Sequence, residues 1–147
     1  MRNYGGIYMY NKAMLSLDQT QAAMTAMIKK ATQEPDRPVT IAIVDDRGNL
    51  LSYARMDNCA TGPQTLAIRK AYTAAMRRMD SATFAENLKK QGQSVSDFGD
   101  HSLVAVQGAV VIVHPETKAI LGGIGISGLS SQEDEDLANI GLEALGL

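Results

Sequence analysis

The sequence predicts one α+β domain in which helices cover an antiparallel sheet. Five short segments are rich in apolar and β-branched residues, and short turns join them into hairpins, which makes the strands antiparallel. Four other segments repeat apolar residues three and four positions apart, as amphipathic helices do. The chain has 147 residues, of which 45% are hydrophobic, enough for one core. We expect an arm at residues 1–13 and one domain at residues 14–147.

The first helix is expected to begin at Ser16. Ser16 and Gln19 have the spacing of a capping box, in which each side chain binds the other residue's backbone amide. Apolar residues then recur on one face, and Pro35 and Pro38 stop the helix. The arm before it is either a loose tail or an aromatic segment that packs on a partner subunit. Its aromatic residues are Tyr4, Tyr8 and Tyr10.

A hairpin is expected next, with strands at residues 39–45 and 50–55. Gly48 is the natural left-handed residue of the turn between them. A helix follows, with Pro63 in its first turn, and runs to Met79. A shorter helix then begins at Asp80 or Ser81 and reaches about Lys90.

The last part of the chain is expected to add three strands and a helix. A loop at 91–100 leads to strands at 102–106, 109–113 and 119–126, the first two joined by a tight turn at Gln107 and Gly108. The final helix starts at Ser130 or Ser131, where Ser130 and Glu133 form another capping box.

Composition excludes several classes of function. The chain has 14 Lys and Arg against 16 Asp and Glu, a net charge of −2, so no basic surplus is present to neutralise nucleic-acid phosphates. One cysteine and two histidines exclude a cysteine-based or three-histidine metal site, so we expect no metal. No apolar run is long enough to span a membrane, and the N-terminus has no export signal. These features favour a cytoplasmic protein.

The glycine-rich segment at 122–131 is the first candidate binding site. It leaves a strand and enters a capped helix, where free backbone amides and the helix dipole favour an anion. Gly125, Ser127 and Gly128 are the candidate ligand-binding residues of this loop. The alternative is that its glycines only allow a helix to pack tightly on the sheet.

Two cations are further candidates for ligand binding. Arg55 ends a strand and can bind a carboxylate with two parallel hydrogen bonds, unless it pairs with Asp57 on the surface. Lys70 lies on the following helix and either reaches an anion in a pocket or is solvated.

Four segments together resemble one protein family. They are 44–51 (VDDRGNLL), 54–57 (ARMD), 67–74 (AIRKAYTA), and 123–128 (GIGISG) followed by 132–135 (QEDE). In this order they resemble the GlcG/HbpS-like family, which includes the C-terminal domain of PduO-type corrinoid proteins. The resemblance extends over roughly residues 15–145.

The resemblance implies a profilin-like three-layer α/β/α fold around a five-stranded antiparallel sheet. It also implies a homo-oligomer, as a dimer, tetramer or octamer, and haem as a ligand, since several members bind haem. The PduO-type domain has a haem-ligating histidine in its N-terminal helix, but the helix expected at 16–32 has none. The axial ligand therefore cannot be assigned to a position.

We carry three hypotheses of function. The first is an oligomeric intracellular protein that binds a small carboxylate-bearing ligand, haem or a related tetrapyrrole among them. The second is a cofactor-free lyase or hydrolase for a small carboxylate, perhaps aromatic, with Tyr72, Asp45 or His101 transferring the proton. The third is an oligomeric scaffold without chemistry.

Overall fold

Four antiparallel strands form the sheet of the computed structural model, which describes residue 6 and residues 9–147. The strands are β1 (Thr40–Asp45), β2 (Leu50–Arg55), β3 (Ala109–Val113) and β4 (Ile120–Ser127). Their order across the sheet is β2-β1-β4-β3, so β1 and β4 are central and β2 is an edge strand. The α+β class predicted from the sequence is confirmed.

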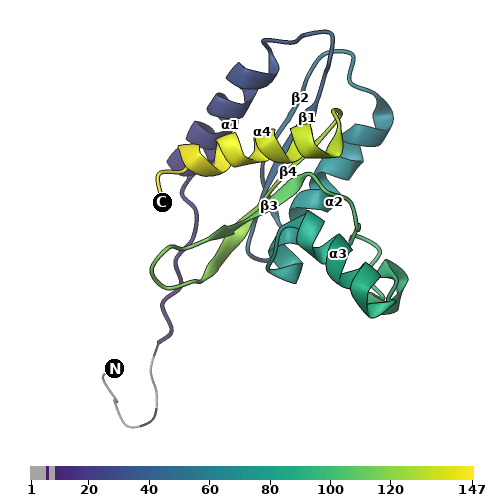
Figure 1. The fold of residues 1–147 in the computed structure, drawn as a ribbon. Helices are drawn as coiled ribbons and strands as arrows, with labels where there is room; N and C mark the ends of the chain where they lie inside the picture. Colours follow the sequence, from purple (N-terminus) through teal and green to yellow (C-terminus); the bar gives the residue numbers. More distant parts are fainter. Residues whose placement is uncertain (1–5, 7–8) are drawn as a thin grey trace.

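Helices cover both faces of this sheet (Figure 1). Helices α1 (Leu17–Ala31) and α4 (Ser131–Ala144) lie side by side on one face. Helix α2 (Thr61–Arg77) covers the other face and contacts β1, β3 and β4. Helix α3 (Ser81–Gln91) packs beside α2, and a short 3-10 helix (Val95–Phe98) follows it.

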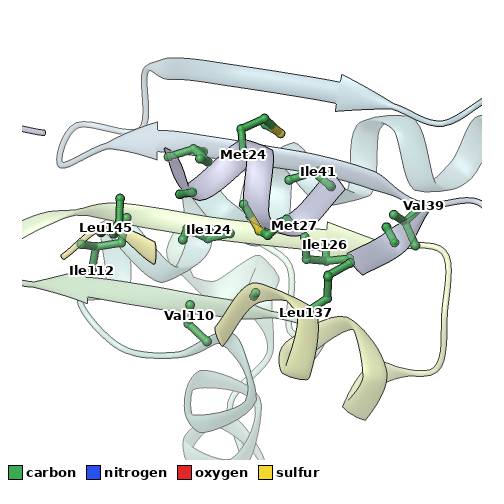
Figure 2. Close-up of a cluster of buried hydrophobic side chains, with 14 of the residues drawn as sticks. Met24, Met27, Val39, Ile41, Val110, Ile112, Ile124, Ile126, Leu137 and Leu145 are labelled. Atoms are coloured by element: carbon green, nitrogen blue, oxygen red, sulfur yellow. The ribbon is translucent and has the colours of Figure 1, made fainter. Parts of the chain in front are cut away.

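The larger core lies between the sheet and the α1–α4 layer. Figure 2 shows Met27 of α1 and Leu137 of α4 packed on the strands. Alternate residues of the strands point toward this layer because side chains along a strand alternate between faces. These buried strand residues are Ile41, Ile43, Val110, Ile112, Ile124 and Ile126.

On the face of the sheet that α2 covers, the contacts between helix and sheet are made mainly by alanine and glycine. A Cβ atom on Gly125 would lie 2.2 Å from the carbonyl oxygen of Ala67, and one on Gly123 would lie 2.4 Å from that of Ala71. Only glycine therefore allows the backbone of α2 to come this close to β4. The tight-packing interpretation of these glycines is the one that the structure shows.

The expected strand at residues 102–106 is wrong, and with it the five-stranded sheet. Leu103 is buried against Phe84 and Leu88 of α3, and the amide of Val104 donates to the hydroxyl of Thr73 on α2 at 3.0 Å. These residues are held by side chains of two helices and have no strand partner. Because β3 pairs with β4 alone, no hairpin forms at Gln107 and Gly108.

Helix starts and turns mostly follow the expectations. The capping boxes of Ser16 and Ser130 are both present, and Gly48 has a φ of +80° in the β1–β2 turn. The start of α2 differs. Its N-cap is Ala60, which has no side-chain oxygen to bind the first amides of the helix.

The arm is described only from residue 9 onward, apart from Gly6. Tyr4 and Tyr8 lie outside the described residues, and Tyr10 is exposed. Lys12 forms an ion pair with Asp46 in the β1–β2 turn. Within residues 6 and 9–147, no helix combines the length and the apolar character needed to cross a membrane.

Candidate functional site

One row of residues crosses the sheet at the end nearest the start of α2. Arg55 of β2 is paired with Thr40 of β1, and Thr40 is paired with Ser127 of β4. Cross-strand partners share a face, and this face is the one that α2 covers. The register thus places Arg55 and Ser127 in one row, although they are 72 positions apart.

The guanidinium of Arg55 is charged and has few partners. Its Nη1 donates to Oε1 of Gln64 on α2 at 2.8 Å. In the described part of the chain Arg55 forms no ion pair, so the expected alternative of a surface pair with Asp57 does not occur. Its remaining donors are open to a ligand.

Two cavities meet at residues 55–57, on the two sides of the end of β2. The first, of about 430 Å³, lies beside the start of α2 and is also lined by Asn58, Cys59 and Gln64. The second, of about 290 Å³, lies between α1 and β2, and its apolar lining includes Ile28, Ile41 and Ala54. Arg55, Met56 and Asp57 line both.

Two polar features at this end of the sheet lack partners. The hydroxyl of Ser127 forms no hydrogen bond with another described residue, but Ser127 lines neither of the two cavities. The first amides of α2 have no side-chain cap, so the positive end of that helix dipole is uncompensated. The start of α2 lies on the same face as Arg55 and favours an anion there.

The start of α4, by contrast, is occupied by the chain's own carboxylates. The amide of Leu129 donates to Oδ1 of Asp134 at 3.0 Å, and the amide of Ser130 donates to Oε2 of Glu133 at 3.2 Å. Of the expected loop residues, Gly125 is buried beneath α2. Gly128 is exposed and has a φ of +138°, and a Cβ atom there would lie 2.4 Å from the carbonyl oxygen of Pro38.

Lys70 is buried and has a charged partner. Its ammonium donates to Oδ2 of Asp134 and to the carbonyl oxygen of Ile126, both at 2.9 Å. Burial raises the pKa of the Asp134 carboxyl, while Lys70 and the amide of Leu129 oppose this rise. This pair joins α2 to α4, so we leave Lys70 out of the proposed ligand contacts.

The three candidate catalytic residues are not gathered around Arg55. Asp45 lies at the other end of β1, roughly 16 Å from Thr40 at the rise of a strand. Burial raises the pKa of Asp45, but hydrogen bonds from Asn49 and Arg47 outweigh burial and lower this pKa below its usual value.

Tyr72 and His101 lie beside another loop. The hydroxyl of Tyr72 donates to Oδ2 of Asp100 at 2.8 Å, and this bond, with burial, raises the pKa of Tyr72. His101 is exposed in the turn that follows Asp100. The structure therefore gives no arrangement in which these residues and Arg55 contact one small substrate.

A third cavity, of about 280 Å³, lies between the end of α1 and the start of α4. Arg37 lies at its rim and donates to Oε2 of Glu133 at 2.8 Å. This bond and those from Ser130 lower the pKa of Glu133 to about 2. Arg37 here is paired with two carboxylates, those of Glu133 and Glu34, in contrast to Arg55.

Neither histidine lies at these cavities. His114 accepts hydrogen bonds from the amides of Glu116 and Thr117 in the β3–β4 turn, and His101 lies in the exposed turn after Asp100, the residue that binds Tyr72 of α2. Among the described residues, no three His, Cys, Asp or Glu side chains are grouped to hold a metal ion.

Sequence reasoning missed three residues of this region. Gln64 accepts a hydrogen bond from Arg55 and positions it, and Asp134 neutralises Lys70. Thr40 belongs to the row across the sheet, and its hydroxyl lies 3.3 Å from the sulfur of Cys59. Gln64 had a usable signal, because it directly follows the proline that marks the helix start. No sequence signal pointed to Asp134 as the partner of Lys70, since the two residues are 64 positions apart.

An antiparallel sheet between two helical layers, with cavities at one end, defines a small α+β domain. The family model described as "Haem degrading protein HbpS-like" matches residues 15–143. The chain belongs to this HbpS-like family.

Known relatives agree with this assignment. Protein GlcG of Escherichia coli strain K12 is 31% identical over 119 residues, which cover 81% of this chain and 85% of that protein. A crystal structure of a double mutant of HbpS from Streptomyces reticuli has a TM-score of 0.83 and 25% identity, covering 100% of this chain and 97% of that one.

A PduOC–haem complex has the same fold as this chain. Its TM-score is 0.79 at 24% identity, and the match covers 90% of this chain and 95% of that one. This likeness establishes the shared fold.

Proposed function

We propose that this chain is a small-ligand-binding protein that takes the carboxylate of its ligand at Arg55. The observation that carries the proposal is the guanidinium of Arg55, which lines two cavities and has no carboxylate partner in the described chain. An arginine fork matches a carboxylate with two parallel hydrogen bonds. The uncapped start of α2 adds to the preference for an anion.

Haem is the ligand that the family description and the PduOC complex support for this chain. Its propionates fit Arg55. No histidine lies where it could bind the haem iron, because neither His101 nor His114 lines the three cavities described above. The haem part of the proposal therefore rests on Arg55, and we derive no chemistry at the iron.

A haemin titration of the purified protein tests this proposal. We expect a shift of the Soret band whose affinity falls about tenfold or more in Arg55→Gln, since charge-assisted hydrogen bonds are lost. The variants His101→Ala and His114→Ala should bind like the wild type. An unchanged Soret band would reject haem as the ligand, and a band lost in either histidine variant would reject Arg55 as the anchor.

We also infer that the chain forms a homo-oligomer. Edge strand β2 has unpaired backbone groups and exposes Leu50, Leu51 and Tyr53. The first residues of this edge, 50–53, are a template for a strand of a second copy, which leaves residues 55–57 uncovered. Light scattering during size-exclusion chromatography should give a mass above 15.8 kDa that falls in Leu51→Lys. A monomeric mass for the wild type would contradict this inference.

The other two hypotheses have less support. The enzyme hypothesis needs Tyr72, Asp45 or His101 beside the bound acid, and these residues lie away from Arg55. The scaffold hypothesis gives no reason for an unpaired arginine at the meeting point of two cavities. A cytoplasmic location stays a prediction.

A further inference from the structure

We propose that the two cavities at Arg55 form one bipartite site, whose ligand is an amphipathic carboxylic acid with its apolar chain between α1 and β2. This inference rests on the proposed function, because it takes Arg55 as the carboxylate anchor. It adds the chemical class of the ligand and the place of its second half.

The cavities are joined by the end of an edge strand. Residues 55–57 line both cavities, and in the part of the chain that the structure describes no further strand lies outside β2 to separate them. A ligand held at Arg55 on the α2 side of the sheet can therefore pass around this edge to the α1 side.

The two halves have different chemistry. On the α2 side, the lining is polar and includes Asn58, Gln64 and the backbone next to the uncapped helix start. On the α1 side, Ile28, Ile41 and Ala54 present hydrocarbon. Ile28 is 37% exposed although it lies on the face of α1 beside the sheet, so apolar surface remains to be covered there.

The charges fix which end of the ligand goes where. Arg55 is the one cation that lines these two cavities. Asp57 lines both as well, is exposed, and forms no ion pair within residues 6 and 9–147. Asp57 repels a carboxylate that moves away from Arg55, which confines the acid group to the guanidinium and leaves the apolar cavity to the chain.

Binding of straight-chain carboxylates from acetate to octanoate, followed by NMR titration of labelled protein, tests the bipartite site. We expect each added methylene to tighten binding about fourfold until the apolar cavity is filled. Ile28→Gln should flatten this dependence on chain length. Leu17→Gln, which changes an exposed leucine of the same helix outside the cavities, should leave the dependence intact.

The charge variants separate this inference from the proposed function. Arg55→Gln should weaken every acid at least tenfold, Arg47→Gln in the distant β1–β2 turn should not, and Asp57→Asn should tighten every acid. Equal affinities from acetate to octanoate with loss in Arg55→Gln would overturn the bipartite site and leave the proposed function standing. Equal binding by Arg55→Gln and Arg47→Gln would overturn both.

Discussion

Arg55 and Lys70 show how the surroundings of a cation decide its role. Both were candidate ligand residues by type, and both lie on the α2 side of the sheet. Lys70 has a buried carboxylate beside it, whereas Arg55 has one neutral side-chain acceptor and open cavity. The unpaired charge is therefore the one assigned to the ligand.

Removing Lys70 should cost stability. In Lys70→Met the carboxylate of Asp134 is left buried without its cation, a loss of about 3–5 kcal/mol for a broken buried pair. The double variant Lys70→Met with Asp134→Asn should recover part of this loss. Urea unfolding measures both, and a single variant as stable as the wild type would show that the pair contributes little.

Glu133 should make the fold sensitive to acid. Its pKa is about 2 in the folded chain against an ordinary value of 4.5. A carboxyl whose pKa is lowered by folding stabilises the fold above its unfolded pKa. This stabilisation is therefore present above about pH 4.5 and is lost as the pH falls toward 2.

Urea unfolding at pH 6 and pH 3 checks this sensitivity. Glu133→Gln should show a smaller loss of stability between the two pH values than the wild type. Asp36→Asn, which alters an exposed carboxylate without an ion pair in the described chain, is the control. An equal loss in wild type and Glu133→Gln would contradict the assigned pKa.

At the scale of elements, the sequence predicted what depends on local pattern. The four helices, two capping boxes and the β1–β2 turn follow from residues a few positions apart. Residues 102–106 were expected as a strand because they are mostly apolar and the turn residues Gln107 and Gly108 follow them. Thr73 and the α3 side chains that hold this segment are distant in sequence, so no local signal could show them.

The candidate site likewise has one part that a local sequence pattern predicts and another that depends on residues far apart in the chain. Arg55 could be predicted as an anion-binding residue from its type and its place at a strand end. The row that joins it to Thr40 and Ser127 depends on strand order and register, which the sequence pattern did not define. The occupation of the α4 start by Asp134 and Glu133 likewise required the geometry of the folded chain.

The contact of α2 with β4 gives a prediction at this scale. Gly125→Ala places a methyl group 2.2 Å from a backbone oxygen of α2, which must move, at a cost of about 1–3 kcal/mol or more. Gly62→Ala, near the start of the same helix, meets no atom within 4 Å and is the matched control. Thermal unfolding compares them, and equal melting temperatures would refute the close packing.

For the whole molecule, the two helical layers have different roles. The α1–α4 layer covers the large buried side chains of the strands, while the alanine and glycine contacts of α2 hold its uncapped start close to the end of the sheet. The proposed ligand site lies at the edge where these layers and β2 meet. The fold therefore supports a site made of a polar half and an apolar half.

A crystal structure with 6-bromohexanoate tests this account most directly, because bromine is located by its anomalous signal. The account predicts the carboxylate on the guanidinium of Arg55 and the bromine peak between α1 and β2, near Ile28 and Ala54. A bromine peak in the cavity between α1 and α4, or a carboxylate away from Arg55, would contradict it.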